Sequence, residues 1–287
     1  MSRTQRIKSV TIFTVVVLVL LAGVIFFGGS GGHHGSIQEV MKDAVLHESN
    51  KISLFGLKDV NPAVISAYTV TAVLLIAAAL IRVLVIPKFK MVPGKLQMLL
   101  EMAVGLFDDM ARSNSPHRNK FLGLYLFSAG TYIFIGTLFE LFGFQGITTH
   151  GVPIALPAPL SDINAAIAMG CLSYGVIMSG GIAGNGIRGI GKTLKDFSLP
   201  ISMSFRLFGA LLSGLLVTEL VYYYIHLSFV LPVLVGVLFT LLHALIQAYV
   251  LTMLTALFYG EVSEPHHTKH SADADTETTA AAEHGGH

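Results

Sequence analysis

One arginine constrains this chain more than any other residue, because it lies inside an apolar stretch. The stretch covers residues 198–225, and Arg206 is its only basic residue. As a helix, it is long enough to cross a hydrocarbon core of about 30 Å. An arginine at the centre of a membrane helix costs roughly 2.5 to 3.5 kcal/mol on insertion scales, and its guanidinium keeps its proton. We therefore expect Arg206 to act in ion translocation. The alternatives are an ion pair that only holds helices together and a side chain that snorkels to the interface.

The composition excludes most soluble classes. Of the 287 residues, 53% are hydrophobic and 12% are charged, whereas about a quarter of the residues in a soluble domain are charged. A net charge of +1 gives no indication of nucleic-acid binding, and the single cysteine, Cys171, cannot form a disulfide framework. The sequence contains no phosphate-binding glycine loop and no metal-ligand spacing. We therefore predict a polytopic membrane protein without a bound cofactor, metal, nucleotide or nucleic acid.

The hydrophobic segments predict an all-α membrane protein with five to six hydrophobic helices. The last two segments are longer than the hydrocarbon core requires, so we expect a strongly tilted antiparallel hairpin. Apolar residues at helical spacing over residues 91–110 also predict one interfacial amphipathic helix. The hydrophobic segments are residues 10–27, 63–86, 121–144, 161–182, 198–225 and 229–260.

The chain divides by composition into four regions. We expect a leader or first membrane helix at residues 1–27, an external segment at 28–62, an ion-translocating domain at 63–262, and a disordered cytoplasmic tail at 263–287. Most lysines and arginines then lie on the cytoplasmic side, as the positive-inside rule requires. The glycines of residues 180–191 are interpreted as a flexible cytoplasmic turn.

Several polar residues lie at membrane depth, where each is costly and a water-filled path is the default explanation. For Asp162, capping of the next helix is an equally good explanation. For His243, a packing hydrogen bond is the alternative. The predicted path residues are Glu140, Asp162, Glu219, His243 and Gln247, with Asp196 as the acid nearest the cytoplasmic side.

Two motifs carry a resemblance to a known family. They are Ser204-Phe205-Arg206-Leu207-Phe208-Gly209 and Gln247-Ala248-Tyr249-Val250-Leu251-Thr252-Met253-Leu254-Thr255-Ala256. With these motifs the chain resembles subunit a of the F-type ATP synthase membrane sector, and the order of its hydrophobic segments fits from about residue 35 to 262. The resemblance implies that Arg206 faces a rotating ring of c subunits and that Gln247 lies opposite it on the last helix.

The resemblance also implies a function and partners. The chain would conduct protons to and from the c ring through two offset half-channels, with Arg206 as the fixed charge between them, and would carry out no covalent chemistry itself. The implied partners are the c ring, the b-subunit peripheral stalk and the lipid bilayer, in a bacterial inner membrane. An ion-coupled secondary transporter is the alternative class, although the internal repeats of such proteins are absent. The sequence leaves proton against sodium coupling open.

The sequence departs from the family at several positions. Relatives commonly carry asparagine where this chain has Ala210, and we expect His243 to lie level with Ala210 and to supply the missing polar group. The family's outer glutamate and histidine correspond here to Leu215 and Thr240. Lys192 occupies the place of a cytoplasmic-side glutamate, so the inner exit is the least defined part of the path.

Overall fold

The computed structural model describes residues 52–54, 57–117, 119–147, 153–223 and 231–264. The predicted helix at residues 10–27 and nearly all of the predicted tail lie outside the described residues. The chain divides into two compact units. Among the described residues, the first unit contains the segments before residue 77, residues 132–165 and residues 206–247. The second contains residues 77–131, 166–205 and 248–264. Five helices, at residues 62–80, 119–138, 163–185, 198–223 and 231–263, each contribute residues to both units.

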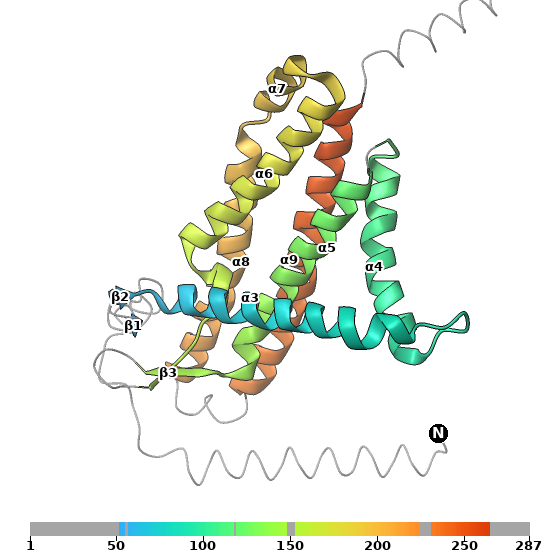
Figure 1. Cartoon of the computed structure of the whole chain (residues 1–287). Helices are drawn as coiled ribbons and strands as arrows, with labels where there is room; N and C mark the ends of the chain where they lie inside the picture. Colours follow the sequence, from blue (N-terminus) through green and yellow to red (C-terminus); the bar gives the residue numbers. More distant parts are fainter. Residues whose placement is uncertain (1–51, 55–56, 118, 148–152, 224–230, 265–287) are drawn as a thin grey trace, which may run out of the picture. The chain divides into compact units, whose positions relative to one another are not determined.

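The described chain is mostly helical, which confirms the predicted all-α membrane class (Figure 1). Four continuous helical segments are long and apolar enough to cross a membrane, and a fifth is added if the bent pair α7 and α8 is one span. The helices are α3 (Pro62–Leu80, extended by short turns to Lys88), α4 (Lys95–Asn114), α5 (Asn119–Leu138, extended by a 3-10 turn at Phe139–Phe142), α6 (Ile163–Asn185), α7 (Ile187–Leu194), α8 (Ser198–Tyr223) and α9 (Leu231–Ser263).

Two short β-hairpins were not predicted from the sequence. Strand β1 (Ile52–Leu54) pairs antiparallel with β2 (Leu57–Val60) just before α3. Strand β3 (Gln145–Ile147) pairs antiparallel with β4 (Pro153–Ala155), with Gly146 opposite Ile154. Strands of three or four residues are too short for alternation of polar and apolar residues to be recognised, and both hairpins lie in segments rich in turn residues.

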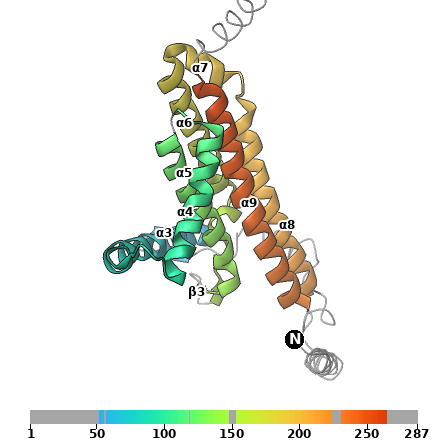
Figure 2. The ribbon, with the colours of Figure 1, turned by 90° about the vertical axis from the view of Figure 1, so that its right-hand side faces the viewer.

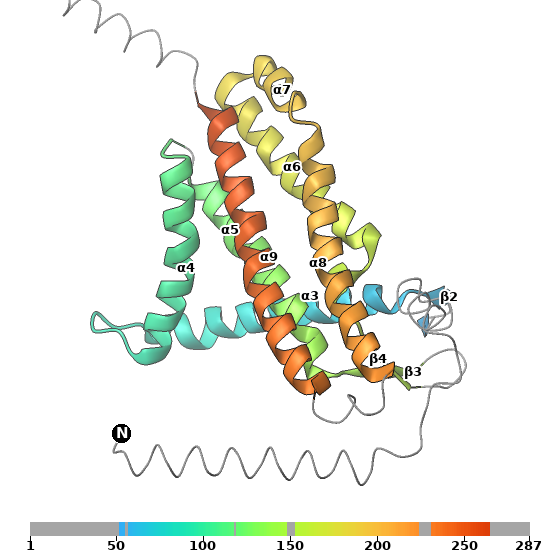
Figure 3. The same cartoon turned by 180° about the vertical axis from the view of Figure 1, so that it is seen from behind.

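In the first unit, α3 packs on the end of α5. Val70 of α3 is buried with Phe139 and Leu156, and Tyr132 packs against this cluster. Within this unit α3 runs crosswise to α8 and α9, which lie side by side as an antiparallel pair (Figures 2 and 3). Large apolar side chains on the rest of α3, such as Tyr68, are exposed, as a helix that faces lipid requires.

In the second unit, small residues let the helix backbones approach closely. Gly180 and Gly184 lie four residues apart on α6 and contact Tyr259 and Ser263 of α9. A Cβ atom at Gly180 would lie 2.5 Å from the Tyr259 ring, and one at Gly184 would overlap the Ser263 carbonyl. Because apolar burial does not drive helices together in lipid, such close packing is a main source of association.

The predicted flexible turn at residues 180–191 is wrong. Helix α6 continues to Asn185, Gly186 turns the chain in a left-handed conformation with φ of 61°, and α7 begins at Ile187. Helix α7 then packs closely on α6, because a Cβ atom at Gly189 would overlap the carbonyl of Gly181. The hydroxyl of Tyr174 donates a hydrogen bond of 3.1 Å to the carbonyl of Thr193. These glycines therefore allow close helix packing, and only Gly186 serves as a turn.

The amphipathic segment forms α4, which begins four residues later than predicted. Its residues pack against α5 in an antiparallel arrangement: Phe107 meets Phe127 edge-on, with ring centroids 5.8 Å apart, and Ala111 lies against Gly123. Most other side chains of α4 are exposed, including Leu96 and Met102. The placement of this helix at the membrane interface remains a prediction.

Candidate functional site

A small cavity in the first unit is lined by two of the predicted path residues, Glu140 and His243. Its volume is about 10 Å³, close to the space that one water molecule requires. Helix α8 contributes only small or apolar side chains to it, whereas α5 with its 3-10 extension and α9 contribute all the polar ones. The lining residues are Thr137, Glu140, Ala210, Leu211, Gly214, Thr240 and His243.

His243 is held in this cavity by its own helix. Its Nδ1 atom lies 3.0 Å from the carbonyl oxygen of Phe239, one turn earlier on α9, and its ring packs against the Phe239 ring at a centroid distance of 5.3 Å. A Cβ atom at Gly214 would lie 3.9 Å from Nδ1, at van der Waals contact, so α8 passes close to the imidazole at this position. Ala210 lines the same cavity, which agrees with the expectation that His243 and Ala210 are level.

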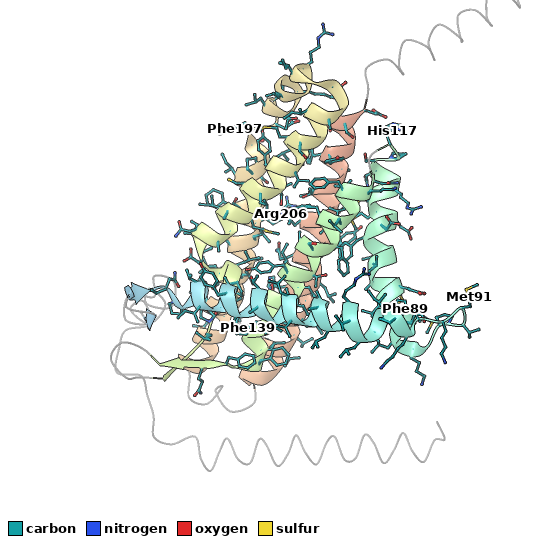
Figure 4. The ribbon with its side chains drawn as sticks, in the orientation of Figure 1. Phe89, Met91, His117, Phe139, Phe197 and Arg206 are labelled. Carbon is teal, nitrogen blue, oxygen red and sulfur yellow. The ribbon has the colours of Figure 1, made fainter. Side chains whose placement is uncertain are left out.

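Arg206 lies on α8, partway along the helix (Figure 4). It is exposed together with Gly209 and Ser213, which follow at helical spacing, whereas Leu207 and Leu211 are buried. Within the described residues, no carboxylate forms an ion pair with Arg206. An exposed cation beside small residues such as Gly209 and Ser213 can approach a group on another chain closely.

Gln247 occupies a different environment from Arg206. Its side chain is only 6% exposed, and across the described part of the chain no hydrogen bond joins it to Arg206. Nevertheless the two residues belong to the same unit, and each lies one helical turn from a cavity residue, Ala210 in α8 and His243 in α9. In an antiparallel pair they are therefore at similar depth, as the sequence indicated.

Asp162 caps a helix. Its Oδ1 atom accepts a hydrogen bond of 2.6 Å from the backbone N–H of Asn164 in the first turn of α6, and its Oδ2 accepts one from the side-chain amide of Asn61. Asn61 in turn caps α3 by accepting a hydrogen bond of 3.0 Å from the backbone N–H of Ala63. Asp162 is absent from the lining of the cavity, so the geometry favours the capping alternative.

Two predicted residues remain, of which only Asp196 has a described side chain, and Asp196 does not line the cavity. Glu219 belongs to α8, but its side chain lies outside the described residues. Asp196 is partly exposed in the turn between α7 and α8, in the second unit. Lys192 donates a hydrogen bond of 2.5 Å to the carbonyl of Glu261 in the last turn of α9. That bond satisfies one of the carbonyls left unpaired at a helix end.

Thr137 is the lining residue that the sequence analysis missed. It lies three residues before Glu140, so both share one face of the helix end, and that spacing could have indicated it. The hydroxyl of a threonine in an apolar helix usually bonds the backbone of its own helix, so Thr137 was not predicted as a site residue. Thr240 also lines the cavity, but the sequence analysis noted it only as the residue at the position of the family's outer histidine.

These features define a class of protein. Several membrane-length helices, with an imidazole, a carboxylate and an arginine placed within their apolar sequences, are characteristic of multi-pass membrane proteins that move ions. The comparison with protein families then specifies which one. The family model described as ATP synthase A chain matches residues 66–260, more than half of the chain, and the chain belongs to this family. It is accordingly a proton-conducting, non-catalytic membrane subunit of the F-type ATP synthase complex.

Proposed function

We propose that this subunit conducts protons through two offset half-channels and that Arg206 separates them by facing the c ring. Protons enter from outside past Glu140 and His243, neutralise a carboxylate of the ring, and leave toward the cytoplasm after that carboxylate reaches Arg206. The fixed cation favours the deprotonated carboxylate and repels protons that would cross directly. The b-subunit stalk is the second protein partner, and the C-terminus is cytoplasmic.

The exposed face of α8 carries this proposal. A rotor helix must pass close to Arg206 without steric obstruction, and Gly209 and Ser213 present almost no side-chain volume beside it. Small residues are the usual means of bringing two membrane helices close together. The buried residues Leu207 and Leu211 hold the other side of α8 within the subunit, which leaves the Arg206 face available to a partner.

The direction of α3 supports a tilted hairpin. Helix α3 and its extension, Pro62–Lys88, form a strongly apolar span with mostly exposed side chains. Within the first unit it runs crosswise to α8 and α9 (Figures 1 and 2). If α3 follows the membrane normal, α8 and α9 must lie at a steep tilt, which gives a ring a long face to move along.

Cysteine cross-linking tests this assignment of faces. In a Cys171→Ser background, we expect Gly209→Cys to form a disulfide with a cysteine placed beside the ring carboxylate, because Gly209 shares the exposed face with Arg206. Leu211→Cys, two residues away on the buried face, is the matched control and should not cross-link. Cross-linking of both variants, or of the Leu211 variant alone, would contradict the proposed ring-facing surface.

A paired substitution tests the role of His243. His243→Ala should lower proton transport by an order of magnitude or more, since a positioned proton carrier is lost. Adding Ala210→Asn should restore part of the rate, because the amide then occupies the same cavity that the imidazole has vacated. The rates are measured as ATP-driven proton uptake by reconstituted complexes. Ala210→Asn alone is the reference for the effect of the added amide on a chain that keeps His243. A double variant no better than His243→Ala would contradict the exchange of polar groups between these two positions, and transport by His243→Ala at the unmodified rate would remove His243 from the proposed path.

A further inference from the structure

An exposed loop in the second unit alternates basic and apolar side chains. It covers residues 88–95, at the end of the first membrane-length span, and its sequence is Lys-Phe-Lys-Met-Val-Pro-Gly-Lys. Met91 is fully exposed and Val92 is 84% exposed, although both side chains are large and apolar. Figure 4 shows Met91 at the outer end of this loop. Exposed apolar side chains with charged residues on both sides mark a surface that meets a partner or a membrane.

The preceding span brings this loop to the level of the lipid headgroups. The span Pro62–Lys88 has 27 residues and is strongly apolar. As a helix it is about 40 Å long, which matches the thickness of a bilayer together with its headgroup regions. A span of this length that crosses the bilayer ends with Lys88 among the headgroups. The loop therefore runs along the membrane surface until α4 begins at Lys95.

The loop and the end of the span are also strongly basic. Between residues 60 and 100 the sequence contains no aspartate or glutamate, but it contains Arg82, Lys88, Lys90 and Lys95. All four side chains are exposed, and among the described residues none of them forms an ion pair. Cations at the headgroup level attract the phosphates of anionic lipids, and each one strengthens membrane binding by about fivefold.

Gln97 holds the loop in its shape. Its side-chain Nε2 donates a hydrogen bond of 3.1 Å to the carbonyl of Lys90, and its Oε1 accepts one of 3.1 Å from the backbone N–H of the same residue. Nε2 also donates a hydrogen bond of 2.8 Å to the carboxylate of Glu101, the nearest acid along α4. Because the bonds to Lys90 use only its backbone, its ammonium group remains available to a ligand.

The exposed apolar surface continues along α4. Leu99, Met102 and Leu106 recur at intervals of three and four residues, so they share one face of the helix, and all three are exposed. Phe107 and Ala111, which pack against α5, lie on a different face. A helix that lies in the membrane interface buries such a free apolar face in lipid.

We propose that the loop at residues 88–95 binds the headgroup of an anionic phospholipid, with Phe89, Met91 and Val92 among the acyl chains. A lysine can place its stem beside apolar groups and keep its ammonium in the headgroup layer, so the alternation of lysine with apolar residues suits a lipid surface. A protein partner suits it less well, because lysine is depleted in the centre of protein interfaces. This inference is independent of the proposed proton path.

A tryptophan reporter tests the proposal, because the chain itself contains no tryptophan. The full chain with Met91→Trp is reconstituted into vesicles of phosphatidylcholine that contain a small fraction of phosphatidylglycerol. Either the phosphatidylglycerol or an equal amount of the phosphatidylcholine carries brominated acyl chains, so quenching reports which lipid lies beside residue 91. We expect phosphatidylglycerol to be enriched there by at least about fivefold over its share. High KCl should reduce this enrichment, because salt screens exposed charges.

Paired lysine substitutions test the origin of the enrichment. Lys88→Gln together with Lys90→Gln removes two charges from the loop and should abolish most of it. Lys120→Gln together with Lys195→Gln is the matched control, because both lysines are exposed in the same unit and lie outside the loop. The control should retain the enrichment. Val92→Trp reports on the same loop if Met91→Trp does not give a folded chain.

Cross-linking in the whole ATP synthase identifies the occupant directly. A benzophenone attached to Met91→Cys, in a Cys171→Ser background, should give an adduct with the mass of this chain plus one anionic phospholipid. An adduct with another subunit would show that a protein covers the loop and would overturn the proposal. Equal quenching by the two lipids, or no quenching by either, would do the same. An enrichment that survives the Lys88 and Lys90 substitutions, or that the control loses equally, would also contradict it.

Discussion

Replacing Arg206 with alanine is expected to lower proton-driven ATP synthesis by at least about 100-fold, because a preorganised charge at the ion-transfer site is lost. Arg206 lies on the exposed face of α8, so the truncation leaves no cavity in the protein core. It also removes an intramembrane charge, which makes insertion more favourable. The variant chain should therefore reach the membrane and assemble normally. The measurement is ATP synthesis by reconstituted complexes, normalised to the amount of assembled subunit.

A conservative substitution sharpens this test. Arg206→Lys keeps the positive charge but loses the planar fork of five donors, and a lysine in an apolar site can release its proton. We expect this variant to fail substantially as well. Passive proton conduction distinguishes the two proposed roles of the charge: Arg206→Ala should leak protons between the half-channels, whereas Arg206→Lys should leak less. Normal ATP synthesis in the Arg206→Ala variant would contradict the proposed role of Arg206 as the charge that separates the half-channels.

The helices were predictable because their physical signal is strong. An apolar run long enough to cross the bilayer has few alternatives to a helix, since lipid leaves no other way to pair the backbone. The predicted segment 63–86 became the span Pro62–Lys88, and residues 229–260 became Leu231–Ser263. The error at α7 arose because glycine is common both in turns and where helices touch. Only tertiary contacts, such as Gly189 on Gly181, distinguish these two uses.

The candidate site was predictable where helical spacing fixed the geometry. Ala210 and His243 could be placed level because each lies one turn from Arg206 or Gln247, and both line one cavity. Asp162 shows the limit of such reasoning, because a carboxylate before an apolar helix has the same sequence pattern as a cap and as a channel acid. Its two hydrogen bonds, to Asn164 and Asn61, favour the cap. For Thr137, the spacing of three residues from Glu140 was the only available signal, and the cavity that both residues line appears only in the structure.

A very close helix contact in the second unit, between α4 and α9, should tolerate substitution poorly. A Cβ atom at Gly260 of α9 would overlap the backbone carbonyl of Asn114 at the end of α4. Backbone cannot rotate away as a side chain can, so α4 and α9 must separate. The hydroxyls of Ser115 and Ser263, 3.4 Å apart, would separate with them. Gly260→Ala should therefore cost more than the roughly 1 to 3 kcal/mol that is typical of overpacking.

The expected result for Gly260→Ala is a large loss of folded subunit, measured as the fraction that stays monodisperse in detergent during heating. Gly236→Ala provides the control on the same helix, because a Cβ atom there would meet nothing within 4 Å. Alanine also favours a helix over glycine by about 1 kcal/mol, so the control should match or exceed the unmodified chain. Both variants gain the same helix propensity and the same methyl group, and they differ only in the approach of α4. If Gly260→Ala melts at the unmodified temperature, the contact between Asn114 and Gly260 does not hold these two helices together.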